Sequence, residues 1–336
     1  MNQSIGVIIP AHNAERLLPE TLASIQKQTV LPDKVIVVDD GSTDATSAIA
    51  KASGAHVIYQ ENSGVSCARN AGIREIDTSY VAFCDADDIW DPRKLERQRD
   101  ALLAQPECEF AFCDYYDFTA DRVLHRSVLN DVLTHFDLRM FERLDATTYR
   151  CNRVPMNQFT LQHSFIMPST VLMHNDLLQR LSTFKEGFVS EEDTEFLLRV
   201  FTQTDAVYID EPLVGYRRHP ANATGDPRRS RVGMLRLAAL VVANADAYRP
   251  GSAEYYRSMF PTYLFRAGRM YASFGNLGMA RWFLARSFEM ERQAKTALWY
   301  AIAPLFLVSP MRWAARRARG SDAQPLPEGS HAMKST

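Results

Sequence analysis

Short apolar segments alternate with helix-like segments through the first third of the chain, and this alternation limits the folds open to it. Apolar residues at helical spacing, such as Leu18, Leu22 and Ile25, separate the apolar runs. One strand and one helix recur about every 25 residues, which predicts a parallel sheet covered by helices on both faces. The expected strands are Ile5–Pro10, Val35–Val38, His56–Tyr59 and Tyr80–Cys84.

Three acidic residues follow the fourth expected strand directly. Asp85, Asp87 and Asp88 lie within four positions, where carboxylates repel one another and lose hydration. Asp85 and Asp87 are two positions apart, so in an extended chain they point the same way and can share a cation. Oxygen ligands of this kind suit Mg²⁺ or Mn²⁺. The alternative is a solvated acidic turn that caps the helix starting near Pro92.

Polar residues also follow the first two expected strands, at His12-Asn13 and at Asp39-Asp40. Ligands of such sheets bind outside the carboxyl ends of the strands, so these clusters and the acidic run converge on one edge. This convergence favours the metal interpretation. Asn13 suits either an Asx turn or a ligand contact, and Asp40 can accept a base N–H. Arg69, on the helix after the third strand, is either a surface residue or a bidentate phosphate ligand.

Four motifs follow one another in the first third of the chain: PAHN, VIVVDDGSTD, SGVSCARNAGI and FCDADDIW. In this order and spacing they resemble the nucleotide-binding half of family 2 glycosyltransferases, which have the GT-A fold. Each motif is weak alone, and together they are specific. The resemblance covers roughly residues 1–110. It implies a nucleotide-diphosphate sugar as donor, a divalent metal ion and transfer of the sugar with inversion.

The resemblance also assigns roles to residues of the first half. The base and ribose of the donor would be surrounded by Pro10, His12, Asn13 and Asp40, with Arg69 approaching the nucleotide. Asp85 and Asp87 would form the DXD pair on ribose and metal. His12 departs from the family pattern, which usually has Tyr or another aromatic residue there. An imidazole ring still stacks on a base, with less area.

An acidic triplet, Glu191-Glu192-Asp193, precedes an apolar helical segment in the second half. Acidic residues at a helix N-terminus are favoured by the helix dipole, so a purely structural role is open. Inverting sugar transfer, however, needs a carboxylate that deprotonates the acceptor hydroxyl. In the family an ED pair ahead of an apolar helix supplies this base. The matching residues are Glu192 and Asp193, and we favour Asp193.

The segment Tyr216-Arg217-Arg218-His219 resembles the part of the family that closes over the diphosphate. On that basis His219 would complete the metal shell or bind phosphate. Arg217 or Arg218 would neutralise the leaving nucleotide diphosphate, where negative charge develops. The alternative is a structural histidine. Tyr115-Tyr116-Asp117 is expected to extend a strand, and Leu129–Arg153 shows no clean periodicity. Phe165–Met173 is expected to be a strand.

The pattern changes to helices alone after residue 231. We expect residues 1–113 to be the nucleotide-sugar-binding half of a GT-A mixed sheet and residues 114–231 the acceptor-binding half with the base. Residues 232–319 would form an all-helical extension, and 320–336 a disordered tail. Within the extension, residues 297–319 combine apolar and aromatic residues with clustered arginines. This composition indicates a helix on an anionic membrane surface or, alternatively, a docked helix with a basic tail.

Composition narrows the class and the setting. A formal net charge of −2 argues against nucleic acid as a partner. The five cysteines lack zinc spacing and suggest reduced thiols in the cytoplasm. No signal peptide and no run near the roughly 20 apolar residues of a membrane span is evident. We therefore expect a cytoplasmic protein, peripheral on the inner face of the membrane. The sequence does not indicate the oligomeric state.

The predicted function is metal-dependent, inverting transfer of a sugar to a hydroxyl of a glycan or lipid-linked acceptor, in cell-surface polysaccharide biosynthesis. Two alternatives stay open. A sugar nucleotidylyltransferase shares the α/β scaffold but needs a glycine-rich loop with a basic residue after the first strand, and AHNAER has no glycine. A non-catalytic nucleotide-sugar sensor or scaffold is the other. The sugar, the nucleotide and the acceptor are not predicted.

Overall fold

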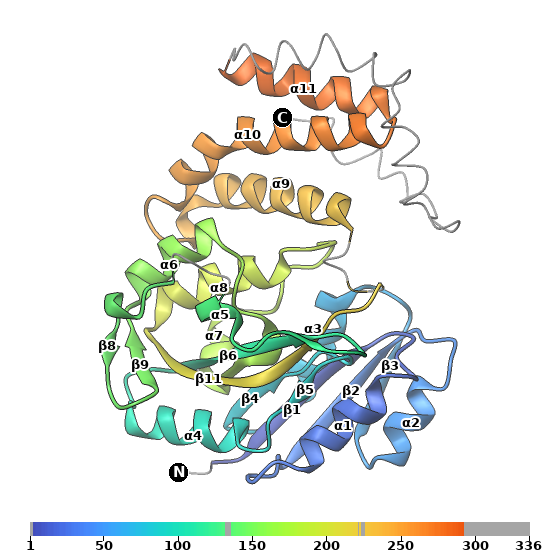
Figure 1. Cartoon of the computed structure of the whole chain (residues 1–336), viewed down its shortest axis with the longest axis vertical. Helices are drawn as coiled ribbons and strands as arrows, with labels where there is room; N and C mark the ends of the chain where they lie inside the picture. The colour runs from blue at the N-terminus through green and yellow to red at the C-terminus, as the bar shows by residue number, and fades with distance from the viewer. Residues whose placement is uncertain (1–2, 132–135, 221, 223–225, 292–336) are drawn as a thin grey trace. The chain divides into compact units, whose positions relative to one another are not determined.

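The structure is a computed structural model that describes residues 3–131, 136–220, 222 and 226–291. It divides into two compact units, residues 1–258 and 259–336. A mixed sheet of 11 strands forms the centre of the first unit (Figure 1). Its strand order is β3-β2-β1-β4-β10-β6-β11-β9-β8, with β5 paired to β11 and β7 to β6.

The strands are β1 Ile5–Ala11, β2 Lys34–Asp40, β3 His56–Gln60, β4 Tyr80–Phe83, β5 Ile89–Trp90, β6 Phe110–Phe118, β7 Val123–His125, β8 Glu142–Arg143, β9 Thr148–Cys151, β10 Val171–His174 and β11 Ala206–Arg217. The α-helices are α1 Leu18–Gln26, α2 Thr46–Ala52, α3 Val65–Glu75, α4 Lys94–Ala104, α5 Val128–Asp131, α6 Arg153–Gln162, α7 Asn175–Leu181, α8 Glu192–Gln203, α9 Pro227–Ala243, α10 Ser252–Ser273 and α11 Leu277–Glu291.

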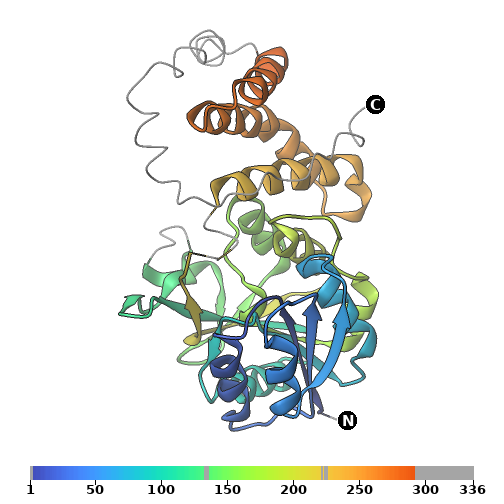
Figure 2. The same cartoon turned by 90° about the vertical axis from the view of Figure 1, so that its right-hand side faces the viewer.

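The first four strands form the predicted parallel half of the sheet, in which β1 pairs with both β2 and β4 and β2 pairs with β3 (Figure 2). Continuous apolar sequences place β1, β2 and β4 in the core, where Ile8 and Val37 are fully buried, whereas the edge strand β3 is partly exposed. Helix α3 packs closely on β1 because Gly72 has no side chain. A Cβ at that position would lie 2.4 Å from a methyl carbon of Ile8. The polar ends of β1, β2 and β4 therefore reach one edge, as expected.

The second half makes the sheet mixed. Strand β10 runs antiparallel to β4 and β6, whereas β11 runs parallel to β6. The short strand β5 pairs with β11 through Trp90 and Val214 and through Ile89 and Gly215. This pairing joins the acidic loop after β4 to the end of β11. It is the long-range connection that assembles the site.

One local prediction was wrong. Phe165–Met173 is not one strand, because Pro168–Thr170 forms a 3₁₀ turn before β10. Proline has a fixed φ and no N–H, so it suits the first position of such a turn and not a central strand. The helix after β2 begins at Thr46, whose N–H donates to the side chain of Asp44.

The described part of the second unit contains the C-terminal portion of α10 and helix α11. A small apolar core, Phe265, Ala272, Ala280 and Leu284, joins these helices. No helix among the described residues is long and apolar enough to cross a bilayer. The region expected to meet a membrane, 297–319, and the expected tail, 320–336, lie outside the described residues. The predicted domain boundaries stay predictions.

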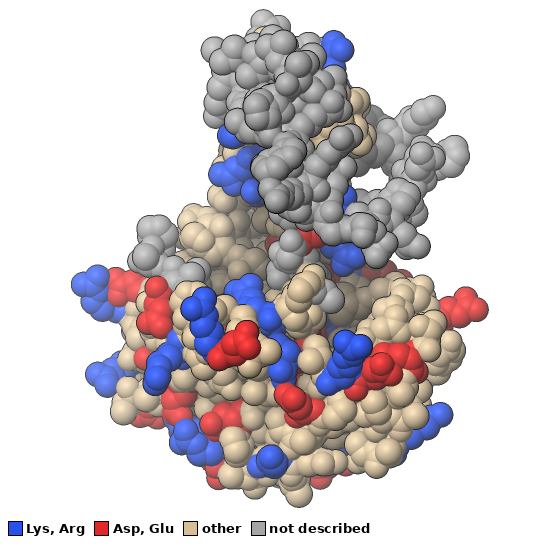
Figure 3. Space-filling view, turned by 45° about the vertical axis from the view of Figure 1, so that its right-hand side comes forward, with Lys and Arg blue, Asp and Glu red and all other residues tan. Residues whose placement is uncertain are grey.

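Acidic and basic side chains are interspersed on the face of the molecule drawn in Figure 3. This distribution agrees with the small net charge of the sequence. A steering field of one sign would need segregated charge.

Candidate active site

The loops after β1 and β2 are bonded to each other at the sheet edge. Nδ1 of His12 donates to the carbonyl oxygen of Asp40 over 2.8 Å. The backbone N–H of Asn13 donates to Oγ of Ser42, and the N–H of Thr43 donates to Oδ1 of Asn13. Asn13 has φ of 49°, a conformation that asparagine tolerates better than most residues. The two predicted donor-binding loops thus form one connected surface.

The carboxylate of Asp40 is buried and holds the segment that leads into α3. It accepts hydrogen bonds from Nε2 of Gln60 and from the backbone N–H groups of Ser63 and Gly64, over 2.7 to 2.9 Å. No sequence motif indicated this structural role of Asp40. The contact with the donor's base that was predicted for Asp40 would use the same carboxylate. Pro10, another predicted donor contact, is buried within β1 opposite Val38.

The acidic loop after β4 meets the residues that follow β11. Nε2 of His219 donates to Oδ2 of Asp87 over 2.8 Å, and Nδ2 of Asn222 donates to the same oxygen over 3.3 Å. Asp88, in the same loop, is fully buried. The structure therefore brings together Asp87 and His219, which the sequence analysis assigned to one metal site. Asn222 is a neighbour that no sequence motif indicated.

The chemistry of these groups suits a divalent cation. Burial and the charge of Asp85 raise the pKa of Asp87, although the His219 hydrogen bond acts to lower it. Burial and the charges of Asp87 and Asp85 raise the pKa of Asp88 well above its usual range. Among the described residues, no three His, Cys, Asp or Glu side chains form a ready-made cage. Mg²⁺ usually needs none, because substrate phosphates and water complete its shell.

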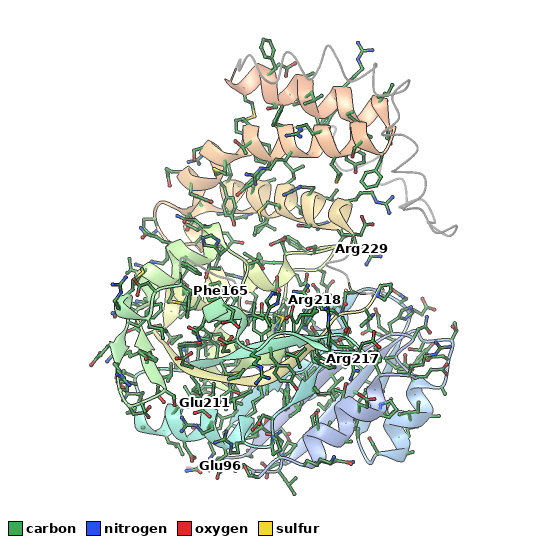
Figure 4. All side chains as sticks on the ribbon, viewed as in Figure 1. Glu96, Phe165, Glu211, Arg217, Arg218 and Arg229 are labelled. Carbon is green, nitrogen blue, oxygen red and sulfur yellow. The ribbon has the colours of Figure 1, made fainter. Side chains whose placement is uncertain are left out.

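Arg217 and Arg218 lie at the end of β11 and have different partners (Figure 4). Nε of Arg217 donates to the carbonyl oxygen of Asp87 over 3.0 Å, and its Nη2 donates to Glu20. Nε of Arg218 donates to the buried carboxylate of Asp117. Neighbouring residues of a strand point to opposite faces. Arg217 is therefore the arginine of this pair that contacts the acidic loop.

Helix α8 begins with an unusual backbone turn. Glu191 has φ of 73° and ψ of 13°, in the left-handed region that residues other than glycine rarely adopt. Its side chain accepts a hydrogen bond from Oγ1 of Thr194. Strain of this kind is often found at functional sites. The turn directs the two carboxylates that follow, Glu192 and Asp193, to different neighbours.

Asp193 lines a pocket whose other walls are apolar, among them Phe83, Met167, Phe184 and Phe196. Burial, followed by the charges of Glu192 and Glu191, raises the pKa of Asp193 to about 8. The backbone N–H of Thr194 and the charge of Arg69 act in the opposite direction. A carboxyl group that titrates near neutral pH is suited to general acid–base chemistry.

The other carboxylate of the pair, Glu192, binds Arg69. The guanidinium of Arg69 donates from Nη1 to Oε1 of Glu192 over 2.9 Å and from Nη2 to Oδ1 of Asp85 over 2.8 Å. Only 2% of the Arg69 side chain is exposed. Arg69 thus connects the acidic loop to the start of α8. The family resemblance placed Arg69 near the nucleotide, and no sequence motif indicated that Arg69 connects Asp85 to Glu192.

A family model described as glycosyl transferase family 2 matches residues 6–173, half of the chain. The chain belongs to glycosyltransferase family 2. The putative teichuronic acid biosynthesis glycosyltransferase TuaG of Bacillus subtilis is 32% identical over 55% of this chain and 74% of its own length. The uncharacterised glycosyltransferase RP339 of Rickettsia prowazekii is 27% identical over 66% of this chain. The chain spans 65% of the length of RP339 and of a second Rickettsia relative.

Solved structures confirm the predicted GT-A fold. The crystal structure of residues 1–349 of Staphylococcus aureus TarS with UDP-GlcNAc has a TM-score of 0.61 at 17% identity, over 94% of this chain and 92% of that chain. The mannosyltransferase PcManGT from Pyrobaculum calidifontis, with GDP-Man and Mn²⁺, has a TM-score of 0.55 at 18% identity, over 94% and 84%. At these identities the likeness shows the fold alone.

Proposed function

We propose that this protein transfers a sugar from a nucleotide-diphosphate donor to a hydroxyl group of a glycan or lipid-linked acceptor, with inversion at the anomeric carbon. The observation that carries the proposal is the chain of contacts from His219 and Asp87 at one end to Glu192 and Asp193 at the other. This chain joins the acidic loop to a carboxyl group with a pKa of about 8.

In the proposed reaction, Asp193 takes the proton from the acceptor hydroxyl. The hydroxyl oxygen attacks the anomeric carbon as the bond from that carbon to the diphosphate breaks, and the nucleotide diphosphate leaves. Apolar side chains line the Asp193 pocket, and the raised pKa of the carboxyl group makes its carboxylate a stronger base than that of a free aspartate. Arg217, beside the acidic loop, contributes positive charge where the leaving group becomes negative.

Asp85, Asp87 and His219 are the residues proposed to hold Mg²⁺ or Mn²⁺, since their oxygen and imidazole donors fit either ion. The ion would supply charge neutralisation for the diphosphate. The donor's base and ribose are proposed to lie on Pro10, His12, Asn13 and Asp40, whose loops form one surface at the sheet edge.

The names of relatives support a role in surface polysaccharide biosynthesis. TuaG carries a teichuronic acid assignment, and WfgD of Escherichia coli, 26% identical over 46% of this chain and 63% of its own length, is a glucosyltransferase for a diphosphoundecaprenol-linked acceptor. We propose an acceptor of this general kind. The proposed setting is the cytoplasmic face of the membrane, approached through residues 297–319.

The test is release of nucleotide diphosphate from a panel of UDP- and GDP-sugars with Mn²⁺, with and without membrane extract as the source of acceptor. Acceptor-dependent release supports the transferase. Binding without release would indicate a nucleotide-sugar sensor or scaffold. Formation of a nucleotide sugar from a sugar phosphate and a nucleoside triphosphate would indicate a nucleotidylyltransferase.

A further inference from the structure

We propose that Arg69 is a positioning residue that fixes the base-bearing start of α8 by tying Glu192 to Asp85 of the donor-side loop. This inference rests on the proposed function and adds to it a physical link between the donor side and the base. Arg69 comes from α3 in the nucleotide-binding half, whereas Glu192 opens α8 in the other half, 123 positions away.

The bridge joins a buried guanidinium to two partly exposed carboxylates. The side chains of Arg69, Glu192 and Asp85 are 2%, 12% and 31% exposed. The planar guanidinium presents its two outer nitrogens in a fixed geometry, so the two carboxylates are held at a fixed separation. The face of the guanidinium lies over the ring of Phe184, with 5.3 Å from Cζ to the ring centroid. Moving either carboxylate would remove one of the two ion-pair partners of the buried guanidinium, which is costly.

The next residue of α3 supports α8 from a second point. Nδ2 of Asn70 donates to the carbonyl oxygen of Phe184, and the N–H of Phe184 donates to Oδ1 of Asn70. The Phe184 ring stacks on Phe196 of α8, with centroids 4.3 Å apart. Two consecutive residues, Arg69 and Asn70, therefore hold the first turns of α8. Asp193 lies directly after Glu192, so these contacts also fix the position of Asp193.

Two residues of the bridge also act on the pKa of Asp193, in opposite directions. The positive charge of Arg69 acts to lower the pKa of Asp193, and the negative charge of Glu192 acts to raise it. Side chains that served packing alone would not shift the pKa of Asp193 in these two directions. The pH dependence of turnover is therefore the readout that separates a positioning role from a structural one.

The first experiment compares pH profiles of turnover for Arg69→Met, Arg69→Lys and Glu192→Gln. We expect the acidic limb of the kcat profile to move to higher pH in Arg69→Met and to lower pH in Glu192→Gln. Lysine keeps the charge but offers a single ammonium group, so kcat should fall while the limb stays near that of the wild type. Limbs that stay in place in both Arg69→Met and Glu192→Gln, or that move the same way, would overturn the inference.

A matched control is available in Arg150. Its guanidinium also joins two carboxylates, Glu107 over 2.7 Å and Asp205 over 3.1 Å. Arg150 lies on β9, however, near the opposite end of the strand order from β1, β2 and β3. Arg150→Met should lower the melting temperature without moving the limb. If Arg69→Met fails to fold, Glu192→Gln alone decides the question, because it keeps the size of the side chain.

The second experiment measures hydrogen exchange of peptides covering residues 186–199 with and without UDP or GDP and Mn²⁺. We expect nucleotide binding to slow hydrogen exchange of these peptides in the wild type. In Arg69→Lys, nucleotide that binds should leave the exchange rate of the same peptides unchanged. Binding that leaves exchange unchanged in the wild type would overturn the bridge while the proposed function stands. Absence of both binding and turnover would remove the proposed function, and the inference with it.

Discussion

Nε2 of His219 lies 2.8 Å from Oδ2 of Asp87, although the two residues are 132 positions apart in the chain. The pairing of β5 with β11 produces this proximity, because it fixes the end of β11 beside the loop after β4. The structure thus places a carboxylate and an imidazole side by side in the loop region that follows the buried strand β4.

The first prediction concerns metal-dependent nucleotide binding. Asp87→Ala removes a proposed metal ligand and His219→Ala removes its partner, so each should weaken Mn²⁺-dependent binding of UDP or GDP by about tenfold or more. Calorimetric titration with and without Mn²⁺ measures the effect. His125→Ala is the control, because His125 makes an equivalent 2.8 Å pair with Asp117. Equal affinities with and without Mn²⁺ in the wild type would contradict the prediction.

The second prediction tests the strand pairing that assembles the site. A Cβ at Gly215 would lie 2.6 Å from the phenol oxygen of Tyr116 and 2.8 Å from a side-chain carbon of Ile89. Gly215→Ala should therefore push β5 away and destabilise the fold by about 1–3 kcal/mol. It should also weaken Mn²⁺-dependent nucleotide binding. Both are measured on the same sample, by thermal unfolding and by titration.

The control for Gly215→Ala is Gly278→Ala on α11, where the nearest atom to an added Cβ is 3.9 Å away. Alanine has a higher helix propensity than glycine, so this variant should be as stable as the wild type or more so. Loss of nucleotide binding in the control, or its full retention in Gly215→Ala, would count against the role of the β5–β11 pair.

The third prediction follows from the pKa of Asp193. The folded value is about 8, whereas an unfolded aspartate titrates near 3.9. Between these values the folded state keeps a proton that the unfolded state has lost, so the free energy of unfolding falls as the pH rises from about 4 to about 8. Asp193→Asn has no carboxyl group to titrate at this position, so this decrease in the free energy of unfolding should be absent from the variant. Its melting temperature should exceed that of the wild type by a few degrees at pH 8 and match it near pH 4.

Asp44→Asn should change stability in the opposite direction. Burial acts to raise the pKa of Asp44, but hydrogen bonds from Thr46 and from the backbone outweigh it and lower the pKa. Its stabilising contribution is present above the unfolded pKa and is lost as the pH falls through the lower folded value. Asp44→Asn should therefore be less stable than the wild type at neutral pH. Identical pH dependence in the two variants would contradict the assignment for Asp193.

The parallel half of the fold was predictable because its signals are local. Apolar runs indicated β1 to β4 within two residues at each end, and the polar residues after them indicated the edge where the candidate site lies. The resemblance then added Asp193 and His219, which lie in segments whose neighbours the sequence alone does not reveal. Strand β6 extends through Tyr115-Tyr116-Asp117, as expected.

The contacts that complete the site were not predictable, because they join distant segments. Nothing in the helical segment around Arg69 indicates that its two partners are Asp85 and Glu192. The same holds for Asp40, whose carboxylate satisfies two backbone N–H groups of the α3 approach. The left-handed turn at Glu191 had no signal either, since glutamate is not a residue that favours positive φ. Local patterns report burial and turns, and long-range polar partners depend on the completed fold.

The most direct test of the account compares Asp193→Asn with the wild type, using the donor sugar that the wild type accepts. Asparagine keeps the size of the side chain and removes its ability to take a proton. We expect the rate of nucleotide diphosphate release to fall by about 10²-fold or more, as for loss of a general base, while the affinity for nucleotide with Mn²⁺ stays within a factor of about two to three, since the proposed donor contacts are intact. A variant that turns over at the wild-type rate would contradict the assignment of Asp193 as the base.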